Sequence, residues 1–303
     1  MRIISLISSA TEIVCSLGCS DLLVGVSHEC DYPDEISTLP ICSEPKFDVS
    51  GSSLEVDKRV KSLLQEALSI YRIKEDKISQ LKPDIIITQS QCKVCAVSLD
   101  DVHNALKKQL GIDPLIISLE PNNLNDVLMD IQNLGNALGK DQLAKTIIKT
   151  FKTEIDHLKQ FNRNKKKHTV ACIEWIEPLM YAGNWVPEIV DIAGGDDLFG
   201  LNGEHSSWSE YSTLFKKNPD KIIFMPCGYD IKKTKSEVKS LYHIKGWSEL
   251  KAVKEGSTYI ADGSQYFNRP GPRLLDSIKI MHDIVSDTDS YGYHGKGWEK
   301  IAI

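Results

Sequence analysis

The chain has 303 residues, of which 41% are hydrophobic and 26% are charged, a composition typical of a globular protein with one large or two moderate domains. Its formal net charge of −6 argues against a nucleic-acid-binding surface. No apolar run approaches the length that spans a bilayer, so we expect neither a nucleic-acid partner nor stable membrane insertion.

The chain opens with "MRIISLISSATE", in which the apolar run is shorter than the roughly 7–15 residues of a signal-peptide core. The segment is better interpreted as a buried strand, and because the chain begins at Met1 we expect no cleaved leader. Eight cysteines are scattered along the sequence without a secretion signal, which favours thiols or metal ligands over disulfides. These features predict a cytoplasmic protein.

Short β-branched apolar runs alternate with helical patterns, which is typical of α/β folds with mostly parallel sheets. A first set of strands is predicted at 2–8, 22–27, 84–89 and 115–119, and a second set at 169–175, 222–227 and 258–262. Between the sets lies a helical stretch in which Gly135 and Gly139 are candidates for a bend or a break. The basic run "NRNKKKH" that follows it is interpreted as a solvated linker.

A short sequence pattern that occurs twice supports two lobes. "LKPDIIIT" and "KNPDKIIFM" share a helix end, a Pro-Asp turn and a hydrophobic strand, and one lies in each set of strands. We therefore predict an α/β fold of two doubly wound lobes with mostly parallel sheets, joined by a single long helix, with a ligand cleft between the lobes. The predicted ranges are 1–121 for the N-terminal lobe, 122–163 for the connecting helix, 167–286 for the C-terminal lobe and 287–303 for a peripheral tail.

In open parallel α/β sheets, ligands bind outside the carboxyl ends of the strands. The residues after the predicted strands are polar or aromatic, as in "SSATE" after the first strand and "SHECDYP" after the second. Ser9 and Glu12 have the spacing of a capping box that would start the next helix. The residues expected to bind a ligand at these ends are Tyr32, Gln89, Trp175, Trp185, Tyr266, Phe267, Arg269 and Arg273.

Two of these features have a structural alternative. Trp185 precedes a predicted helix, so its ring could stack on a flat ligand or serve as a hydrophobic staple. In "YFNRPGPR", two prolines stiffen a loop that carries Arg269 and Arg273. Their guanidinium groups suit a carboxylate or a phosphate, or could form ion pairs within the protein.

Cys92 and Cys95 form a Cys-x-x-Cys pair just after the third predicted strand. The pair could hold a metal, act in redox chemistry, contact a ligand or pack as small core residues. A structural zinc site needs four ligands and the sequence has no second Cys-x-x-Cys, which argues against a zinc ribbon. Cys30 and His28 could complete a zinc or iron site with the pair, although a lone histidine is more often a hydrogen-bonded structural residue.

The chain has none of the common catalytic signatures. There is no nucleophile elbow, Walker loop, dinucleotide-binding glycine fingerprint or His-Glu-x-x-His sequence. We therefore assign no catalytic residue, and the aromatic and thiol-rich strand ends favour binding over turnover.

Five segments together resemble the class III substrate-binding proteins, the vitamin B12 and iron-siderophore binding family, and are most similar to its B12-binding branch. They are "IISLISSATEIVCSLGCSDLLVGVSHECDYP", "ISQLKPDIIITQ", "VPEIVDIAGGDDLFG", "WSEYSTLFKKNPDKIIFM" and "FNRPGPRLLDSI". The resemblance covers most of residues 2–286. It implies two α/β lobes joined by one long helix, with the ligand held between them and only modest closure.

By this resemblance, Tyr32, Trp185, Phe267 and Arg273 correspond to residues that line the cleft of B12-binding members. Acidic residues of such proteins dock arginines of a membrane permease, and the resemblance places the corresponding segments near Asp76 and Asp191.

The sequence also departs from the family pattern. Residues 46–72 are interpreted as an added, partly helical insertion. "QCKVCAVS" lies outside the usual pattern and resembles a cytoplasmic subgroup labelled cobalamin-binding. The lack of an export signal or lipoprotein cysteine makes a permease partner doubtful.

The leading hypothesis is a cytoplasmic binding protein for a large cofactor-like ligand. The favoured ligand is a corrinoid such as cobalamin. Tyr32, Trp185 and Phe267 would pack against its flat faces, and a thiol could approach the metal. The alternative is an enzyme on the same scaffold that uses Cys30, Cys92 and Cys95 as a metal or thiol site. A third possibility is a protein-interaction module with a vestigial cleft.

Overall fold

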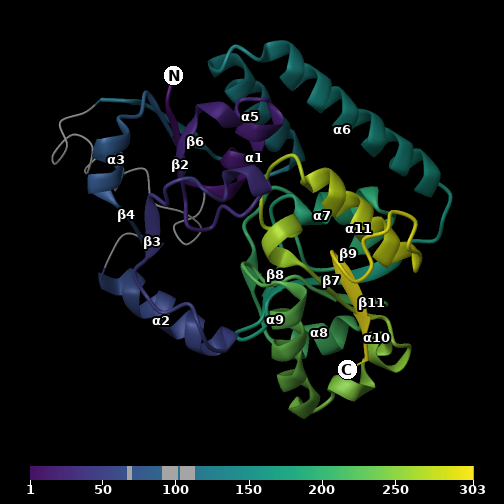
Figure 1. Cartoon of the computed structure of the whole chain (residues 1–303). Coiled ribbons are helices and arrows are strands. Elements are labelled where there is room, and N and C mark those ends of the chain that lie inside the picture. The colour runs from purple at the N-terminus through teal and green to yellow at the C-terminus, as the bar shows by residue number, and fades with distance from the viewer. Residues whose placement is uncertain (67–69, 91–101, 103–112, 303) are drawn as a thin grey trace. The chain divides into compact units, whose positions relative to one another are not determined.

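The computed structural model describes residues 1–66, 70–90, 102 and 113–302, and the chain divides into two compact units (Figure 1). The first unit consists of Met1–Gly51, Glu55–Pro121 and Asn125–Ile148. The second unit consists of Ser52–Leu54, Asn122–Leu124 and Lys149–Ile303. Each unit contains its own α/β sheet, so the predicted two-lobed α/β architecture is confirmed.

The first unit is built on a four-stranded sheet in the order β2-β1-β5-β6, in which all neighbouring strands are parallel. Its strands are β1 (Ile3–Ser5), β2 (Leu23–Val26), β5 (Ile85–Gln89) and β6 (Leu115–Leu119). Ile4 of β1 and Ile86 of β5 are paired in register, so their side chains lie on the same face of the sheet. Both belong to a buried cluster with Ile78 of helix α3 (Glu75–Leu81). All four strands lie where the sequence predicts them.

The predicted insertion at 46–72 belongs to the first unit except for Ser52–Leu54, and a short antiparallel strand pair joins its two ends. These strands are β3 (Ser43–Pro45), which ends just before the range, and β4 (Tyr71–Ile73), which begins at its end. Helix α2 (Ser53–Glu66) supplies the helical part of that range. Helix α1 (Ser8–Ser16) follows β1 directly, so the chain turns into a helix at the carboxyl end of that strand.

The connection predicted over 122–163 contains two helices, α5 (Leu124–Ala137) and α6 (Asp141–Asn162). The break falls at Gly139, whose φ of +68° is a left-handed conformation that glycine adopts without steric cost. Residues of α6 up to Ile148 group with the first unit, and residues from Lys149 group with the second. The long helix that joins the lobes is therefore α6.

The second unit contains a sheet in the order β10-β8-β7-β11-β12-β13, with β9 paired to the start of β7. Its strands are β7 (His168–Trp175), β8 (Met180–Tyr181), β9 (Gly195–Asp197), β10 (Ser207–Trp208), β11 (Lys221–Phe224), β12 (Thr258–Ala261) and β13 (Trp298–Ile301). The strands β7, β11 and β12 are mutually parallel and match the three predicted strands. The strands β8, β10 and β13 are antiparallel to their neighbours.

The predicted tail at 287–303 supplies strand β13, which the sequence analysis does not predict. Trp298 and Ile301 at the ends of this strand are buried, whereas Lys300 is exposed. The two middle residues of this four-residue strand are charged, so the sequence lacks the apolar pattern of a strand. Pairing with β12 places Trp298 and Ile301 against the core.

The remaining elements of the second unit are mostly short helices. They are α7 (Val186–Ile192), α8 (Tyr211–Lys217), α9 (Ile231–Glu237), α10 (Lys251–Lys254), α11 (Leu274–Ser286), two 3₁₀ helices at Val238–His243 and Trp247–Glu249, and a π-helical turn at Gly263–Phe267. Within the described residues, no helix is both long and apolar enough to cross a membrane.

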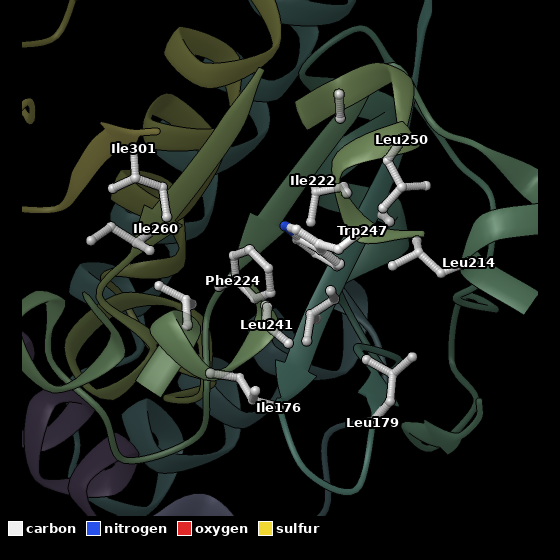
Figure 2. Packing of buried hydrophobic residues seen from close by; sticks show 14 of the residues in the cluster. Ile176, Leu179, Leu214, Ile222, Phe224, Leu241, Trp247, Leu250, Ile260 and Ile301 are labelled. Atoms are coloured by element: carbon white, nitrogen blue, oxygen red, sulfur yellow. The ribbon is translucent and has the colours of Figure 1, made fainter. Parts of the chain in front are cut away.

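Figure 2 shows the buried cluster that covers one face of the second sheet. Ile222 and Phe224 of β11 contribute alternate residues, and Ile260 of β12 lies beside them on the same face. The indole of Trp247 packs against this face, with its ring centroid 6.1 Å from that of Phe224. The period-two pattern that predicts these strands therefore also predicts which of their residues enter this core.

Lys221, the first residue of β11, is a buried lysine that holds the end of α11. Its side chain is 2% exposed, and its ammonium donates to the Ile284 carbonyl at 3.1 Å and the Asp287 carboxylate at 2.5 Å. Ile284 lies in the last turn of α11, where a cation is favoured by the helix dipole. Burial lowers the pKa of Lys221, against the opposing effect of the Asp287 charge.

Replacing Lys221 by methionine is expected to lower the free energy of unfolding by about 1–2 kcal/mol. Hydrogen bonds to charged groups contribute about 1.5–3 kcal/mol, and part of this loss is offset because an ammonium is no longer buried. Denaturant unfolding at neutral pH measures the change. Lys300→Met is the matched control, since Lys300 lies 3.6 Å from the same carboxylate but is 49% exposed. Its loss should stay below about 0.5 kcal/mol, and equal losses in both variants would contradict the capping role.

Candidate functional site

The carboxyl edge of the first sheet carries hydroxyl and thiol groups that hydrogen-bond to one another. Thr11 in α1 donates from its hydroxyl to Ser5 Oγ at 2.8 Å, and its Oγ1 lies 3.1 Å from Cys30 Sγ. Ser8 Oγ donates to the Glu29 carbonyl at 2.9 Å. The segment after β2 is therefore tied to the first turns of α1.

The capping box predicted from Ser9 and Glu12 does not form, because the helix starts two residues earlier than Ser9 as N-cap would require. Ile7 is the N-cap of α1 and has no side chain that could accept a hydrogen bond. Ser9 is then the second residue of the helix, and both Ser9 and Glu12 are buried.

His28 is oriented by its neighbours in the first unit. Its Nδ1 lies 2.8 Å from Ser43 Oγ, and its ring centroid lies 4.9 Å from that of Tyr71. Burial, followed by the Lys74 charge, lowers the pKa of His28 and so favours the neutral imidazole. The hydroxyl of Tyr71 also donates to Glu29 Oε1 at 2.7 Å, which connects strand β4 to the "SHECDYP" segment.

Cys92 and Cys95 lie outside the described residues, so the predicted metal set with His28 and Cys30 stays a prediction. Within the part of the chain that the structure describes, no three His, Cys, Asp or Glu side chains form a group that could hold a metal ion. The six described cysteines are free thiols.

Gln89 and Tyr32, the two ligand-binding candidates of the first unit, differ in exposure. Gln89 ends β5 and is 3% exposed, and its Nε2 has no hydrogen-bond partner among the described residues. A buried donor without a partner lowers stability. An acceptor that reached this amide would therefore form a hydrogen bond that the described residues do not provide. Tyr32 is 46% exposed and follows β2 within the "SHECDYP" segment.

The carboxyl edge of the second sheet carries an aromatic pair. Trp175 ends β7, and its ring centroid lies 5.3 Å from that of Tyr229, which follows β11. The ammonium of Lys233, in α9, lies 4.7 Å from the centroid of the Tyr229 ring. Trp175 Nε1 donates to the Glu177 carbonyl at 3.1 Å, which fixes the indole at the end of its strand. This arrangement presents aromatic and cationic groups together.

Lys233 is a site residue that is not predicted from the sequence, whereas Tyr229 follows a predicted strand. Tyr229 is buried, and its hydroxyl has no partner among the described residues. Burial, together with the nearby Glu237 carboxylate, raises the pKa of this hydroxyl and keeps it neutral. Lys233 follows Tyr229 by four residues and lies in the first turn of the short helix α9, so the two side chains are close along the chain.

Trp185 and Phe267, predicted as cleft-lining aromatics, are both buried inside the second unit. Trp185 is 7% exposed and Phe267 is fully buried. Trp185 Nε1 donates to the Phe267 carbonyl at 2.8 Å, so the indole anchors the loop that follows β12. In this structure Trp185 supports the loop, and its stacking on a ligand stays a prediction.

The loop after β12 begins as a π-helical turn capped by Asp262, whose carboxylate accepts from the Gln265 amide at 2.7 Å. A side chain at Gly263 would clash with the Pro226 carbonyl, so glycine is required for the loop to approach the end of β11. Burial raises the pKa of Asp262 to about 6, even though Arg269 and Arg273 act to lower it. A carboxyl group that titrates near neutrality is typical of functional sites.

Both arginines of this loop are more than nine-tenths buried. Arg269 Nη2 donates to Ser264 Oγ at 3.5 Å, and Arg273 Nη1 donates to Gln265 Oε1 at 3.4 Å. The Arg273 guanidinium also lies 5.5 Å from the centroid of the Tyr266 ring. The structure therefore places Tyr266, Arg269 and Arg273 in one rigid loop at the carboxyl edge of the second sheet.

Residues 3–264 match a protein family described as "Periplasmic binding protein". An uncharacterized ABC transporter substrate-binding lipoprotein of Bacillus subtilis is 24% identical over 298 residues, which cover 95% of this chain and 81% of the relative. A vitamin B12-binding protein of Vibrio parahaemolyticus is 24% identical over 280 residues, which cover 91% of this chain and 86% of that protein.

Solved structures show the same fold. A possible iron-binding periplasmic protein from Staphylococcus epidermidis aligns with a TM-score of 0.71 at 20% identity, covering 94% of this chain and 98% of that one. The periplasmic vitamin B12-binding protein of Vibrio cholerae aligns with a TM-score of 0.67 at 20% identity, covering 95% and 98%. A periplasmic heme-binding protein from Pseudomonas aeruginosa aligns with a TM-score of 0.69 at 17% identity, covering 94% and 92%.

These comparisons contradict the predicted cytoplasmic location and do not support a cytoplasmic subgroup. The B. subtilis relative is named a lipoprotein, and the V. cholerae and P. aeruginosa structures are of periplasmic proteins. The prediction rests on interpreting the first apolar run as a strand, and β1 is indeed a buried strand. A strand describes how the lobe folds and carries no information about the compartment.

The family model matches residues 3–264, and the two α/β units align with solved structures of periplasmic binding proteins. The chain belongs to the periplasmic binding protein family.

Proposed function

We propose that this protein is the substrate-binding component of an ABC-type importer and that it acts outside the cytoplasm. The proposal is supported by family membership and by the B. subtilis relative, which is named as an ABC transporter substrate-binding lipoprotein. Several further relatives are named vitamin B12-binding proteins. Their names favour a large cofactor-like ligand over an ion or a simple nutrient.

We propose a corrinoid such as cobalamin as the ligand. The observation that carries this choice is the Trp175–Tyr229 pair with the Lys233 ammonium close to it at the carboxyl edge of the second sheet. Aromatic faces pack against flat, apolar macrocycles, and a neighbouring ammonium suits a peripheral phosphate or carbonyl. The loop after β12 adds two guanidinium groups at the same sheet edge, both of them more than nine-tenths buried.

The test is a calorimetric titration of the reduced, metal-analysed protein with hydroxocobalamin, with the visible spectrum recorded in parallel and hemin as the comparison ligand. We expect one-to-one binding of hydroxocobalamin with micromolar or tighter affinity. Tight hemin binding without hydroxocobalamin binding would replace the corrinoid by a porphyrin. Binding of neither compound would reject this ligand class, and stoichiometric zinc or iron in the protein would then favour the thiol-site alternative.

We further propose that a membrane permease docks on the segments around Asp76 and Asp191, which the resemblance places near the permease-docking acids of the family. Asp76 is exposed in the first turn of α3, and the carboxylate of Asp191 in α7 is 61% exposed. Lys167 Nζ lies 2.5 Å from Asp191 Oδ1, so an incoming arginine would have to exchange with this lysine. An exposed ion pair contributes little, so the exchange would cost little free energy.

A further inference from the structure

A separate cavity lies in the second unit where α6, α7 and α11 end. Its volume is about 200 Å³, and Asn162, Lys165, Lys166, His168, Gly194 and Ser286 are among the residues that line it. His168 is the first residue of β7, so the cavity lies at the amino edge of that strand. Trp175 ends the same strand, so this cavity and the aromatic pair are at opposite ends of β7.

The cavity contains an excess of positive charge. Among the described residues that line it, two are lysines, one is a histidine and none is acidic. The ammonium of Lys165 lies 3.4 Å from the centroid of the Phe161 ring, and within the described chain neither Lys165 nor Lys166 pairs with a carboxylate. The next lysine, Lys167, does pair with Asp191. Two lysines of the run interpreted as a solvated linker therefore line this cavity without a carboxylate partner among the described residues.

Capping of α7 and α11 does not require these lysines. Lysines are common at helix C-termini because they bind the last carbonyl groups. Other donors already occupy such carbonyls here: Asn162 Nδ2 donates to the Ile192 carbonyl at 3.1 Å, and Lys221 Nζ donates to the Ile284 carbonyl at 3.1 Å. Lys165 and Lys166 therefore remain available to an external anion.

We propose that this cavity binds a small oxyanion of the phosphate class. Pockets for drug-sized ligands have volumes of about 300–1,000 Å³, so a cavity of about 200 Å³ suits a small ion and excludes a macrocycle. Lysine ammonium groups bind phosphate as point charges, and the Ser286 hydroxyl adds a donor. Because the cavity is at the amino edge of β7, it is independent of the proposed corrinoid site.

The test is a calorimetric titration of the full chain with inorganic phosphate at constant ionic strength in chloride buffer. Lys165→Gln/Lys166→Gln is the test variant. Lys216→Gln/Lys217→Gln is the matched control, because these consecutive lysines end α8 and are exposed outside the cavity. We expect the test variant to bind phosphate at least about tenfold more weakly and the control to bind like the wild type. Hydroxocobalamin binding should be the same in all three proteins, which separates this proposal from the proposed function.

Three outcomes would overturn the proposal. The first is no phosphate binding to the wild type at millimolar concentration. The second is equal phosphate affinity in all three proteins, which would indicate a general salt effect on the surface. The third is binding to phosphatidylglycerol vesicles, lost in the test variant, without binding to inorganic phosphate. That result would replace the free anion by a lipid surface.

Discussion

Replacing Trp185 by alanine is expected to lower the free energy of unfolding of the second unit by about 3–5 kcal/mol, the usual cost of truncating a buried tryptophan. The side chain is 7% exposed, and its indole donates to the Phe267 carbonyl at 2.8 Å. The substitution therefore opens a cavity and also leaves a buried carbonyl without its donor. Denaturant unfolding followed by far-UV circular dichroism measures the loss.

Two further variants separate these effects. Trp208→Ala is the matched control, since Trp208 lies on strand β10 of the same unit but is 54% exposed, and its loss should be within about 0.5 kcal/mol. Trp185→Phe keeps one aromatic ring but removes the donor and part of the indole, so a loss of about 1–3 kcal/mol is expected. If Trp185→Ala is no more harmful than Trp208→Ala, Trp185 does not anchor the loop.

The same variants decide between the two interpretations of Trp185. A residue that supports the loop from behind should leave hydroxocobalamin affinity nearly unchanged in Trp185→Phe, provided that the variant is folded at the assay temperature. A loss of tenfold or more in a folded Trp185→Phe protein would restore the ligand-stacking interpretation. Affinity and stability therefore have to be measured on the same preparation.

The sequence predicts the central strands well because their burial is encoded locally. The runs that become β5 and β11 are short, apolar and rich in isoleucine, and each follows a Pro-Asp turn. The strands β8 and β10 have two residues each, and β13 has charged residues at two of its four positions. Such strands exist only because a neighbouring strand pairs with them, so their own residues do not reveal them.

The candidate site is predictable in kind but not in detail. The sequence places aromatic and basic residues at the carboxyl ends of the strands, and Trp175 and the arginine loop do lie there. It cannot decide whether Trp185 faces a ligand or the protein, because its partner Phe267 is 82 residues away along the chain. The contact between Tyr229 and Trp175 becomes visible only when the end of β11 is seen beside the end of β7.

Replacing Trp175 by alanine is expected to weaken hydroxocobalamin binding by about tenfold to a hundredfold. Tryptophans at the centre of a binding site commonly contribute 2 kcal/mol or more, and each 1.4 kcal/mol is a factor of ten in affinity. The Trp175 ring is positioned by its contact with Tyr229 at 5.3 Å and by the hydrogen bond to the Glu177 carbonyl. Little binding energy is therefore spent on ordering it. Calorimetric titration of the variant measures the change.

Because Trp175 is only partly buried, its removal should cost much less stability than removal of Trp185. Trp208→Ala again serves as the control and should bind hydroxocobalamin like the wild type. If Trp175→Ala also binds like the wild type, the aromatic pair is not the ligand surface and the proposed corrinoid site is wrong. If Trp175→Ala loses affinity while folded Trp185→Phe keeps it, the two tryptophans have separate roles: Trp175 contacts the ligand, and Trp185 holds the loop that carries the arginines.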